Sequence, residues 1–257
     1  MSMHLTPLLL AKSWNVTSVV RNPDHKDEIL KLGQGHPGKI DVLVASLEDV
    51  KSDADAQKVL DKVQPDYVVW SAGAGGKGGP SRTYAVDQDA AKHYISSSLS
   101  TPSVTKFLMV SYIASRKARP PWWTDEDWNL AQHVNSDVLP HYFKAKVEAD
   151  EHLAAAAKKR LDSSDSVFQA INLRPGVLMD SKATGRVNLG KTSSRGNVSR
   201  EDVALVAAAL LERSDTRGWF DLLEGDVDIA TAIDRLVQEG HNGMEGEDME
   251  RIYARAS

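Results

Sequence analysis

The chain has 257 residues, and its charge and composition exclude several classes of protein before any motif is considered. Its 31 lysines and arginines are outnumbered by 36 aspartates and glutamates, so it has no cationic excess to neutralise a nucleic-acid backbone or a membrane surface. The absence of cysteine excludes a disulfide framework and a thiolate metal site, and no metal site is predicted. The apolar run LTPLLLA is too short to span a membrane and lacks the flanks of a signal peptide. We therefore expect a soluble, cytoplasmic protein that binds a small molecule, and the oligomeric state stays open.

Short β-branched runs alternate with longer helical segments, a pattern typical of a doubly wound α/β sheet. We predict one domain over 1–257, with a Rossmann-type core at about 4–225, helices on both faces, and a polar tail at about 240–257 that could form one short helix. The predicted strands are 15–20, 39–45, 66–72, 105–111, 167–173 and 218–225. The predicted helices are 4–14, 25–33, 53–63, 85–99, 141–161 and 201–212.

The carboxyl ends of four predicted strands are polar or rich in glycine. Ligands bind beyond these ends in open parallel sheets. Loops favour the same residue types, so a single end says little, but four together favour a ligand site. The four ends are Arg21-Asn22-Pro23, the loop that begins Ser71-Ala72-Gly73, Ser111-Tyr112, and Arg174-Pro175-Gly176.

The stretch HYFKAK carries the strongest chemical signal. Tyr142 and Lys146 are four residues apart near the start of a predicted helix, so both project from one face. A lysine ammonium near a phenol favours the phenolate, which lowers the tyrosine pKa and suits it to proton transfer. A solvated helix face is the alternative, because this spacing is common by chance. The pair gains weight because it follows the strand that ends in Ser111, whose hydroxyl could bind the same substrate oxygen.

Taken in order, these motifs resemble the short-chain dehydrogenase/reductase superfamily, and within it the atypical NmrA-like and epimerase-like NAD(P)-binding members. The resemblance rests on Ser71-Ala72-Gly73, Ser111, Tyr142-x-x-x-Lys146 and Arg174-Pro175-Gly176, and extends over about residues 4–225. It implies that Tyr142 is the catalytic acid or base, that Lys146 binds the nicotinamide ribose and tunes the tyrosine, and that Ser111 orients the substrate. It also implies cofactor contacts from Ser71, Ala72, Gly73, Pro175, Gly176 and Val177, the last three against the nicotinamide.

The hexapeptide GAGGKG at 73–78 matches the dinucleotide-binding pattern G-x-G-x-x-G. Gly79 and Pro80 follow it, and helical patterning resumes only near residue 85, so we expect it to lack the helix entry that a phosphate-binding turn requires. Lys77 precedes a glycine, which excludes a P-loop. By the resemblance, the loop passes beside the adenosine and ribose of the cofactor, where glycines permit close approach. A merely flexible loop is the alternative.

Arg21 occupies the position where, by the resemblance, the family selects its cofactor. An arginine there suits a 2′-phosphate, whereas an acidic residue would accept the ribose 2′-hydroxyl. NADP is therefore favoured over NAD, with a solvated surface arginine as the alternative.

Only MSM precedes the first predicted helix, so by the resemblance a first strand and its glycine turn are missing. That strand would be central, and its loss would expose strand edges and remove the cradle of the pyrophosphate. Either the chain is a truncated gene model or splice form, or it is no longer an enzyme. We favour truncation, because the remaining motif series is intact.

The segment 115–140 between Ser111 and Tyr142 contains Trp122, Trp123 and Trp128. These side chains could line a substrate lid, or they could belong to a surface insertion that packs its own aromatic residues.

Two classes of function follow. The first is an NADP-dependent oxidoreductase that acts on a small carbonyl or alcohol, with Tyr142 as proton donor or acceptor. The second is a non-catalytic, NmrA-like regulatory protein that senses NAD(P) and contacts a protein partner. A truncated form with impaired cofactor binding is a further alternative.

Overall fold

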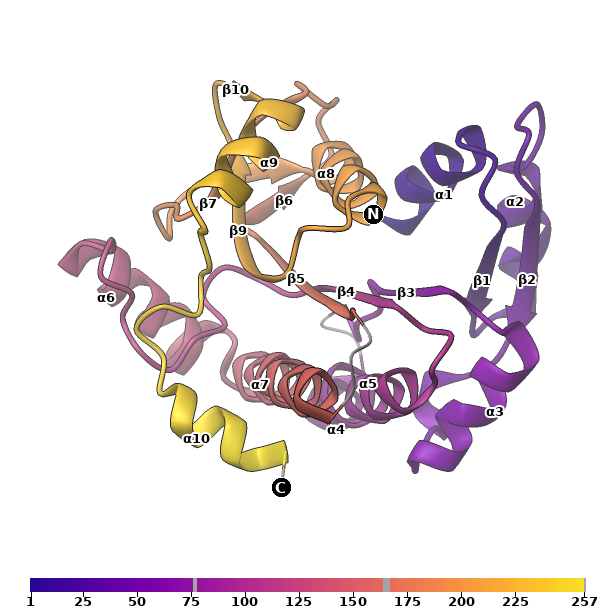
Figure 1. Ribbon diagram of the computed structural model, residues 1–257, viewed down its shortest axis with the longest axis horizontal. Helices are drawn as coiled ribbons and strands as arrows, with labels where there is room; N and C mark the ends of the chain where they lie inside the picture. The colour runs from indigo at the N-terminus through magenta and orange to yellow at the C-terminus, as the bar shows by residue number, and fades with distance from the viewer. Residues whose placement is uncertain (76–77, 164–166, 257) are drawn as a thin grey trace.

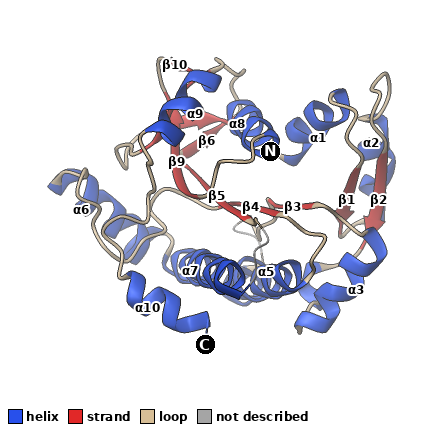
Figure 2. Cartoon of the chain, in the orientation of Figure 1, coloured by secondary structure: helices blue, strands red, loops and turns tan. Residues whose placement is uncertain are grey.

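The computed structural model describes residues 1–75, 78–163 and 167–256, so Gly76 and Lys77 of the GAGGKG loop lie outside the described residues. A central, mostly parallel sheet is flanked by helices on both faces (Figures 1 and 2). The predicted doubly wound α/β fold is thereby confirmed.

In the part of the chain that the structure describes, the central sheet has six strands in the order β10-β7-β9-β5-β4-β3. Four of them run parallel: β3 (Tyr67–Trp70), β4 (Lys106–Val110), β5 (Gln169–Pro175) and β9 (Gly218–Glu224). The antiparallel strands β7 (Arg186–Gly190) and β10 (Val227–Asp228) complete one end. The residues of β4 are buried almost throughout, as expected of a parallel strand that is covered on both faces.

Further pairs of strands lie outside this sheet. The parallel pair β1 (Val16–Val20) and β2 (Ile40–Val44) stands apart from β3, and β6 (Val177–Met179) pairs with β8 (Asn197–Ser199). In Figure 1, β1 and β2 lie at the right, beyond β3. Among the described residues no strand joins β1 to β3.

Helices from both halves of the chain cover the sheet. One face carries α3 (Asp53–Val63), α5 (Ala91–Ser100) and α7 (Pro140–Ser163). The other carries α1 (Ser2–Ala11), α8 (Arg200–Glu212) and α9 (Ile229–Gln238). The short α2 (Lys26–Lys31) lies beside β2, and α10 (Met249–Tyr253) packs on α7. The remaining helical segments are α4 (Gly79–Thr83), α6 (Asp125–His133), η1 (Pro23–His25), η2 (Leu47–Asp49), η3 (Tyr84–Ala90), η4 (Val134–Val138) and η5 (Ala254–Ala256).

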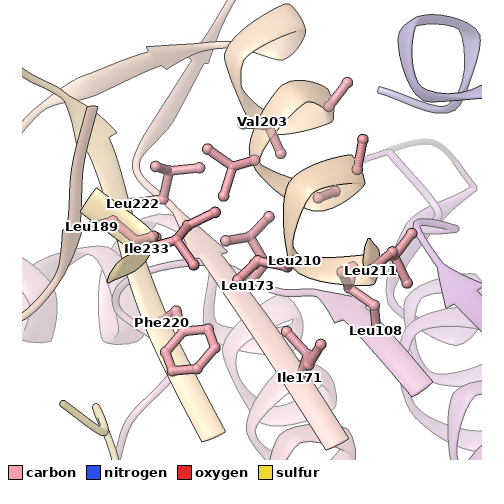
Figure 3. Packing of buried hydrophobic residues seen from close by; sticks show 14 of the residues in the cluster. Leu108, Ile171, Leu173, Leu189, Val203, Leu210, Leu211, Phe220, Leu222 and Ile233 are labelled. Atoms are coloured by element: carbon pink, nitrogen blue, oxygen red, sulfur yellow. The ribbon is translucent and has the colours of Figure 1, made fainter. Parts of the chain in front are cut away.

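Two apolar cores lie on the two faces of the sheet. The first joins α8, α9 and α1 to the strands, with Leu173 and Phe220 from the sheet beneath Leu210 from α8 (Figure 3). The second joins α3, α5 and α7 to the opposite face. Side chains of β4 alternate between the cores: Leu108 belongs to the first, and Phe107 and Met109 to the second. No helix in the described ranges combines the length and hydrophobicity needed to cross a membrane.

One expectation about the glycine loop was wrong. The helix after it begins at Gly79, not near residue 85, and continues through η3 into α5. Pro80 lies in the first turn, where its missing N–H costs nothing and its fixed φ suits the helix. Gly78 precedes the helix with φ +87°, a conformation that glycine adopts without strain. A helix therefore does begin directly behind the GAGGKG loop.

Leu210 tests the first core. Its side chain is fully buried, so Leu210→Ala should lower the free energy of unfolding by about 2–5 kcal/mol. The matched change Leu130→Ala, at a position 39% exposed on α6, should stay within about 0.5 kcal/mol of the parent. Urea unfolding followed by circular dichroism measures both changes. Equal losses of unfolding free energy would show that Leu210 does not belong to the core drawn in Figure 3.

Candidate functional site

One face of α7 carries three ionisable side chains in successive turns: Tyr142, Lys146 and Asp150. The face lies against the carboxyl end of β4. Lys146 Nζ donates to the Val110 carbonyl at 3.0 Å, and Ser111 Oγ donates to Asp150 Oδ2 at 2.7 Å. The predicted trio Ser111, Tyr142 and Lys146 therefore gathers at one strand end, with Asp150 as a fourth member.

Burial dominates the protonation of this face. It lowers the pKa of Lys146, while the carboxylates of Asp150 and Asp87 act in the opposite direction. Burial also raises the pKa of Tyr142, and the same two carboxylates reinforce that shift. The Tyr142 pKa therefore moves opposite to the direction expected from Lys146, because desolvation and two carboxylates both raise it. At neutral pH the Tyr142 hydroxyl keeps its proton.

Tyr142 lies at the open end of the face. Its ring is 5.1 Å from the Tyr112 ring, measured between centroids, and Tyr112 donates to Asn135 at 2.7 Å. Within the described residues the Tyr142 hydroxyl makes no hydrogen bond, so it is available to a ligand.

A buried ionic network lies behind Asp150. Arg174 Nη1 lies 3.7 Å from Asp150 Oδ2, and its Nε donates to Asp221 at 3.1 Å. Arg116 donates to both oxygens of Asp221, at 3.2 and 2.9 Å. All four side chains are fully buried, and removing one charge would leave its partner uncompensated. Arg174, which the sequence predicted only as part of a polar strand end, thus connects Asp150 to Asp221 beneath the site.

The glycine loop after β3 is tied to the site by Asp87. The Ala74 amide donates to Asp87 Oδ2 at 2.9 Å, and burial raises the pKa of this carboxyl, against the opposing effect of the Ala74 hydrogen bond and of Lys146. Asp87 Oδ1 is buried and has no hydrogen-bond partner among the described residues. A Cβ at Gly73 would lie 2.8 Å from this oxygen, so a larger residue there would have to displace the Asp87 carboxyl.

Arg21 continues the site along the carboxyl edge of the strands. Its Nη1 donates to Glu48 Oε1 at 2.7 Å, and Arg82 Nε donates to the same oxygen at 2.9 Å. These hydrogen bonds lower the pKa of Glu48. Arg82 Nη1 lies 3.4 Å from the Ala74 carbonyl, so Arg21 connects through Glu48 and Arg82 to the glycine loop. Two guanidinium groups therefore share one carboxylate oxygen at this end of the site.

The three residues predicted to lie against the nicotinamide, Pro175, Gly176 and Val177, differ in their exposure at the end of β5. Pro175 is buried within the sheet, whereas Val177 is 63% exposed. A Cβ at Gly176 would lie 2.5 Å from the Gly196 carbonyl oxygen, so this glycine is required by close backbone packing. Of the three, only Val177 offers a large exposed apolar side chain. Ser71 and Ala72 line the cavity beside β3.

The aromatic insertion packs against residues outside it. Trp123 is buried with Ile113, Ala131 and Leu223, and its Nε1 donates to the Thr192 carbonyl at 2.8 Å. Trp122 donates to the same carbonyl at 3.1 Å. Of the two alternatives for this segment, the geometry favours the packed insertion over a lid.

Sequence reasoning missed four polar residues of the site. Asp150 could have been found, because it lies four residues beyond Lys146 on the same helix face. Asp87 could not, because it lies in η3, a π-helical stretch whose side chains do not follow the usual period. Glu48 and Arg82 carry no motif, and only the folded chain brings them to Arg21.

Comparison with known proteins identifies the family of this chain. The model of a family described as NAD(P)H-binding matches residues 1–214. The chain belongs to this NAD(P)H-binding family. The predicted nicotinamide cofactor is thereby supported, without a distinction between NAD and NADP.

The chain is similar to several known proteins. The UPF0659 protein of Schizosaccharomyces pombe is 33% identical over 204 residues, which cover 77% of this chain and 78% of the relative. The uncharacterized sugar epimerase YhfK of Bacillus subtilis is 29% identical and covers 84% of this chain and 90% of its own. A solved structure from Bacillus halodurans, described as an NAD-dependent epimerase/dehydratase, is 26% identical, with a TM-score of 0.70 and coverage of 91% and 94%.

The geometry of the loop can be tested against a nicotinamide dinucleotide. The unpartnered Asp87 Oδ1 can accept a hydrogen bond from a ribose hydroxyl, and Gly73 lets the backbone approach. A carboxylate repels phosphate, so the same loop suits the ribose better than the pyrophosphate. The residues present therefore fit the nucleoside part of the cofactor.

His152 holds the site helix against α5 and gives a pH test. Its Nε2 lies 2.8 Å from Ser96 Oγ, and burial lowers its pKa from 6.5 to about 4. As the pH falls below 6.5, His152 becomes protonated in the unfolded chain but stays neutral in the folded chain until about pH 4. The free energy of unfolding therefore falls between pH 6.5 and 4.

We therefore expect wild type to lose more unfolding free energy than His152→Gln between pH 6.5 and 4. Urea unfolding at a series of pH values measures the difference, with His25→Gln, at an exposed site, as the control that retains the wild-type slope. Parallel slopes for wild type and His152→Gln would contradict the assignment.

Proposed function

We propose that this protein is an NADP-dependent oxidoreductase of the short-chain dehydrogenase/reductase type that acts on a small carbonyl or alcohol. The observation that carries the proposal is the placement of Tyr142 and Lys146 on one helix face at the end of β4, in a chain of an NAD(P)H-binding family. Relatives named as an epimerase and an epimerase/dehydratase support redox chemistry at a carbon bearing oxygen.

The nicotinamide, when bound, supplies or accepts the hydride. In the direction of reduction, the Tyr142 hydroxyl donates its proton to the carbonyl oxygen as negative charge develops there. Its raised pKa keeps that proton in place at neutral pH. Lys146, fixed by the Val110 carbonyl, stabilises the tyrosinate that remains. In the reverse direction Tyr142 takes the proton of the alcohol.

Ser111 has a narrower role than the resemblance implies. Its single hydroxyl proton is donated to Asp150, so in this arrangement Ser111 can accept a hydrogen bond from a substrate alcohol but cannot donate to a carbonyl. Donation to a carbonyl requires the hydroxyl to turn away from Asp150.

The preference for NADP rests on the two guanidinium groups at the Arg21 end of the site. Arg21 and Arg82 share one carboxylate, and a 2′-phosphate can replace Glu48 as their partner. Val177, Pro175 and Gly176 are assigned to the nicotinamide end, and Ser71, Ala72 and Gly73 to the ribose of the adenosine.

Tyr142→Phe tests the chemistry. The variant should bind NADPH as wild type does but lose at least about 100-fold in NADPH-dependent turnover of a panel of small aldehydes and ketones. Tyr253→Phe, which removes a hydroxyl on α10 beside Lys158, towards the opposite end of α7 from Tyr142, is the control that keeps full turnover. Full activity of Tyr142→Phe would exclude the catalytic role, and NADPH binding without turnover by wild type would favour the regulatory alternative.

Arg21→Ala tests the choice of cofactor. Loss of a charge-assisted contact to the 2′-phosphate should weaken NADPH binding by roughly 10-fold or more, while NADH binding stays unchanged. Quenching of tryptophan fluorescence measures both affinities, with Arg186→Ala at the opposite end of the sheet as the control. An equal effect on NADPH and NADH would reject the preference.

A further inference from the structure

The edges of β1 and β3 face one cavity. Among the described residues, β1 pairs with β2 alone and β3 with β4 alone, so each has one edge without a partner strand. A cavity of about 970 Å³ is lined by all of β1, residues 16–20, and all of β3, residues 67–70. The central sheet is thus interrupted at a slot with a strand edge on either side.

The two edges run in the same direction. Arg21 directly follows β1, and the Ala74 carbonyl lies just beyond β3; both connect through Glu48 and Arg82. The carboxyl ends of β1 and β3 therefore meet at the same edge of the molecule.

The backbone groups that face the slot can be assigned. The Val16 amide bonds to Lys39, and the Val20 carbonyl bonds to Ala45, so alternate residues of β1 face β2. The amides and carbonyls of Thr17 and Val19 therefore point into the slot. Before β3, the Asp66 carbonyl accepts a hydrogen bond from the Thr105 amide, so the backbone groups of Asp66 face β4. By the same alternation, the amides and carbonyls of Tyr67 and Val69 point into the slot.

The walls above and below the slot are apolar. Leu9 and Leu211 lie on the side of α1 and α8, and Leu60 and Tyr94 lie on the side of α3 and α5. A strand of five residues occupies about 17 Å by 4.8 Å by 10 Å, on the order of 800 Å³. The cavity has the size of one such strand, and its walls would bury both faces of it.

We propose that this slot binds an extended apolar peptide segment as a parallel β-strand between β1 and β3, with its carboxyl end at the Arg21 edge. The bound strand would join the two sheets into one. A lipid chain would satisfy the walls but would leave the amides and carbonyls of both edges without partners, and that cost favours a peptide. β-branched residues suit the occupant, because both of its faces are buried.

The probe is the free peptide acetyl-KVVIVVK-amide, added to the full chain. Hydrogen exchange observed by NMR should show the amides of Thr17, Val19, Tyr67 and Val69 protected at least roughly tenfold more at saturating peptide. The amides of Ser18 and Val68 face the existing partner strands and should change less. A peptide N-methylated at alternate residues keeps the side chains but lacks the donors towards one strand edge and places methyl groups there, and it should not bind.

Orientation is tested with a nitroxide on either end of the peptide. A label on its carboxyl end should broaden the signals of Arg21 and Ala74, and a label on its amino end those of Asn15 and Asp66. No protection of the four amides at millimolar peptide, equal binding of the N-methylated peptide, or the opposite pattern of broadening would each overturn the proposal.

Discussion

The burial of Asp150 between a hydroxyl and a guanidinium is the interaction on which the rest of the site depends. The carboxylate accepts a hydrogen bond from Ser111 and lies 3.7 Å from Arg174, whose charge is shared with Asp221. Isolated charges in an apolar interior cost several kcal/mol, so each member persists because the others are present. The network fixes α7 over the end of β4 and so decides where Tyr142 and Lys146 lie. The same buried charges therefore both position Tyr142 and Lys146 and set their electrostatic surroundings.

This arrangement also explains the protonation of the reacting face. A solvated lysine beside a tyrosine would lower the pKa of the phenol, but Lys146 is fully buried and faces two carboxylates, Asp150 and Asp87. The raised pKa of Tyr142 suits a proton donor more than a base in the unliganded protein. A bound cofactor would add further charge beside Lys146, so the balance on this face is linked to binding.

The sequence was informative wherever local physics decided the structure. The predicted runs at 15–20, 39–45 and 105–111 became β1, β2 and β4, because β-branched and large apolar residues favour an extended backbone. The start of α4 was misjudged, since the Gly-Pro pair was interpreted as a break although proline is tolerated in the first turn of a helix.

The sequence predicted those site residues that lie on a single element. Tyr142 and Lys146 follow from spacing on α7, but the contacts of Asp87 and Glu48 depend on how distant segments meet. Spacing also gave no measure of burial, and for that reason the direction of the Tyr142 pKa shift was missed.

The most direct test of this account is the affinity for NADPH of Lys146→Met, measured by isothermal titration calorimetry. Methionine preserves the length and packing of the side chain but removes its charge, and Lys144→Met is the matched control at an exposed position two residues earlier. If the buried ammonium belongs to the cofactor site, Lys146→Met binds NADPH at least roughly tenfold more weakly than wild type, while Lys144→Met binds as wild type does. Equal affinity of all three folded proteins would show that the charged face of α7 serves packing alone.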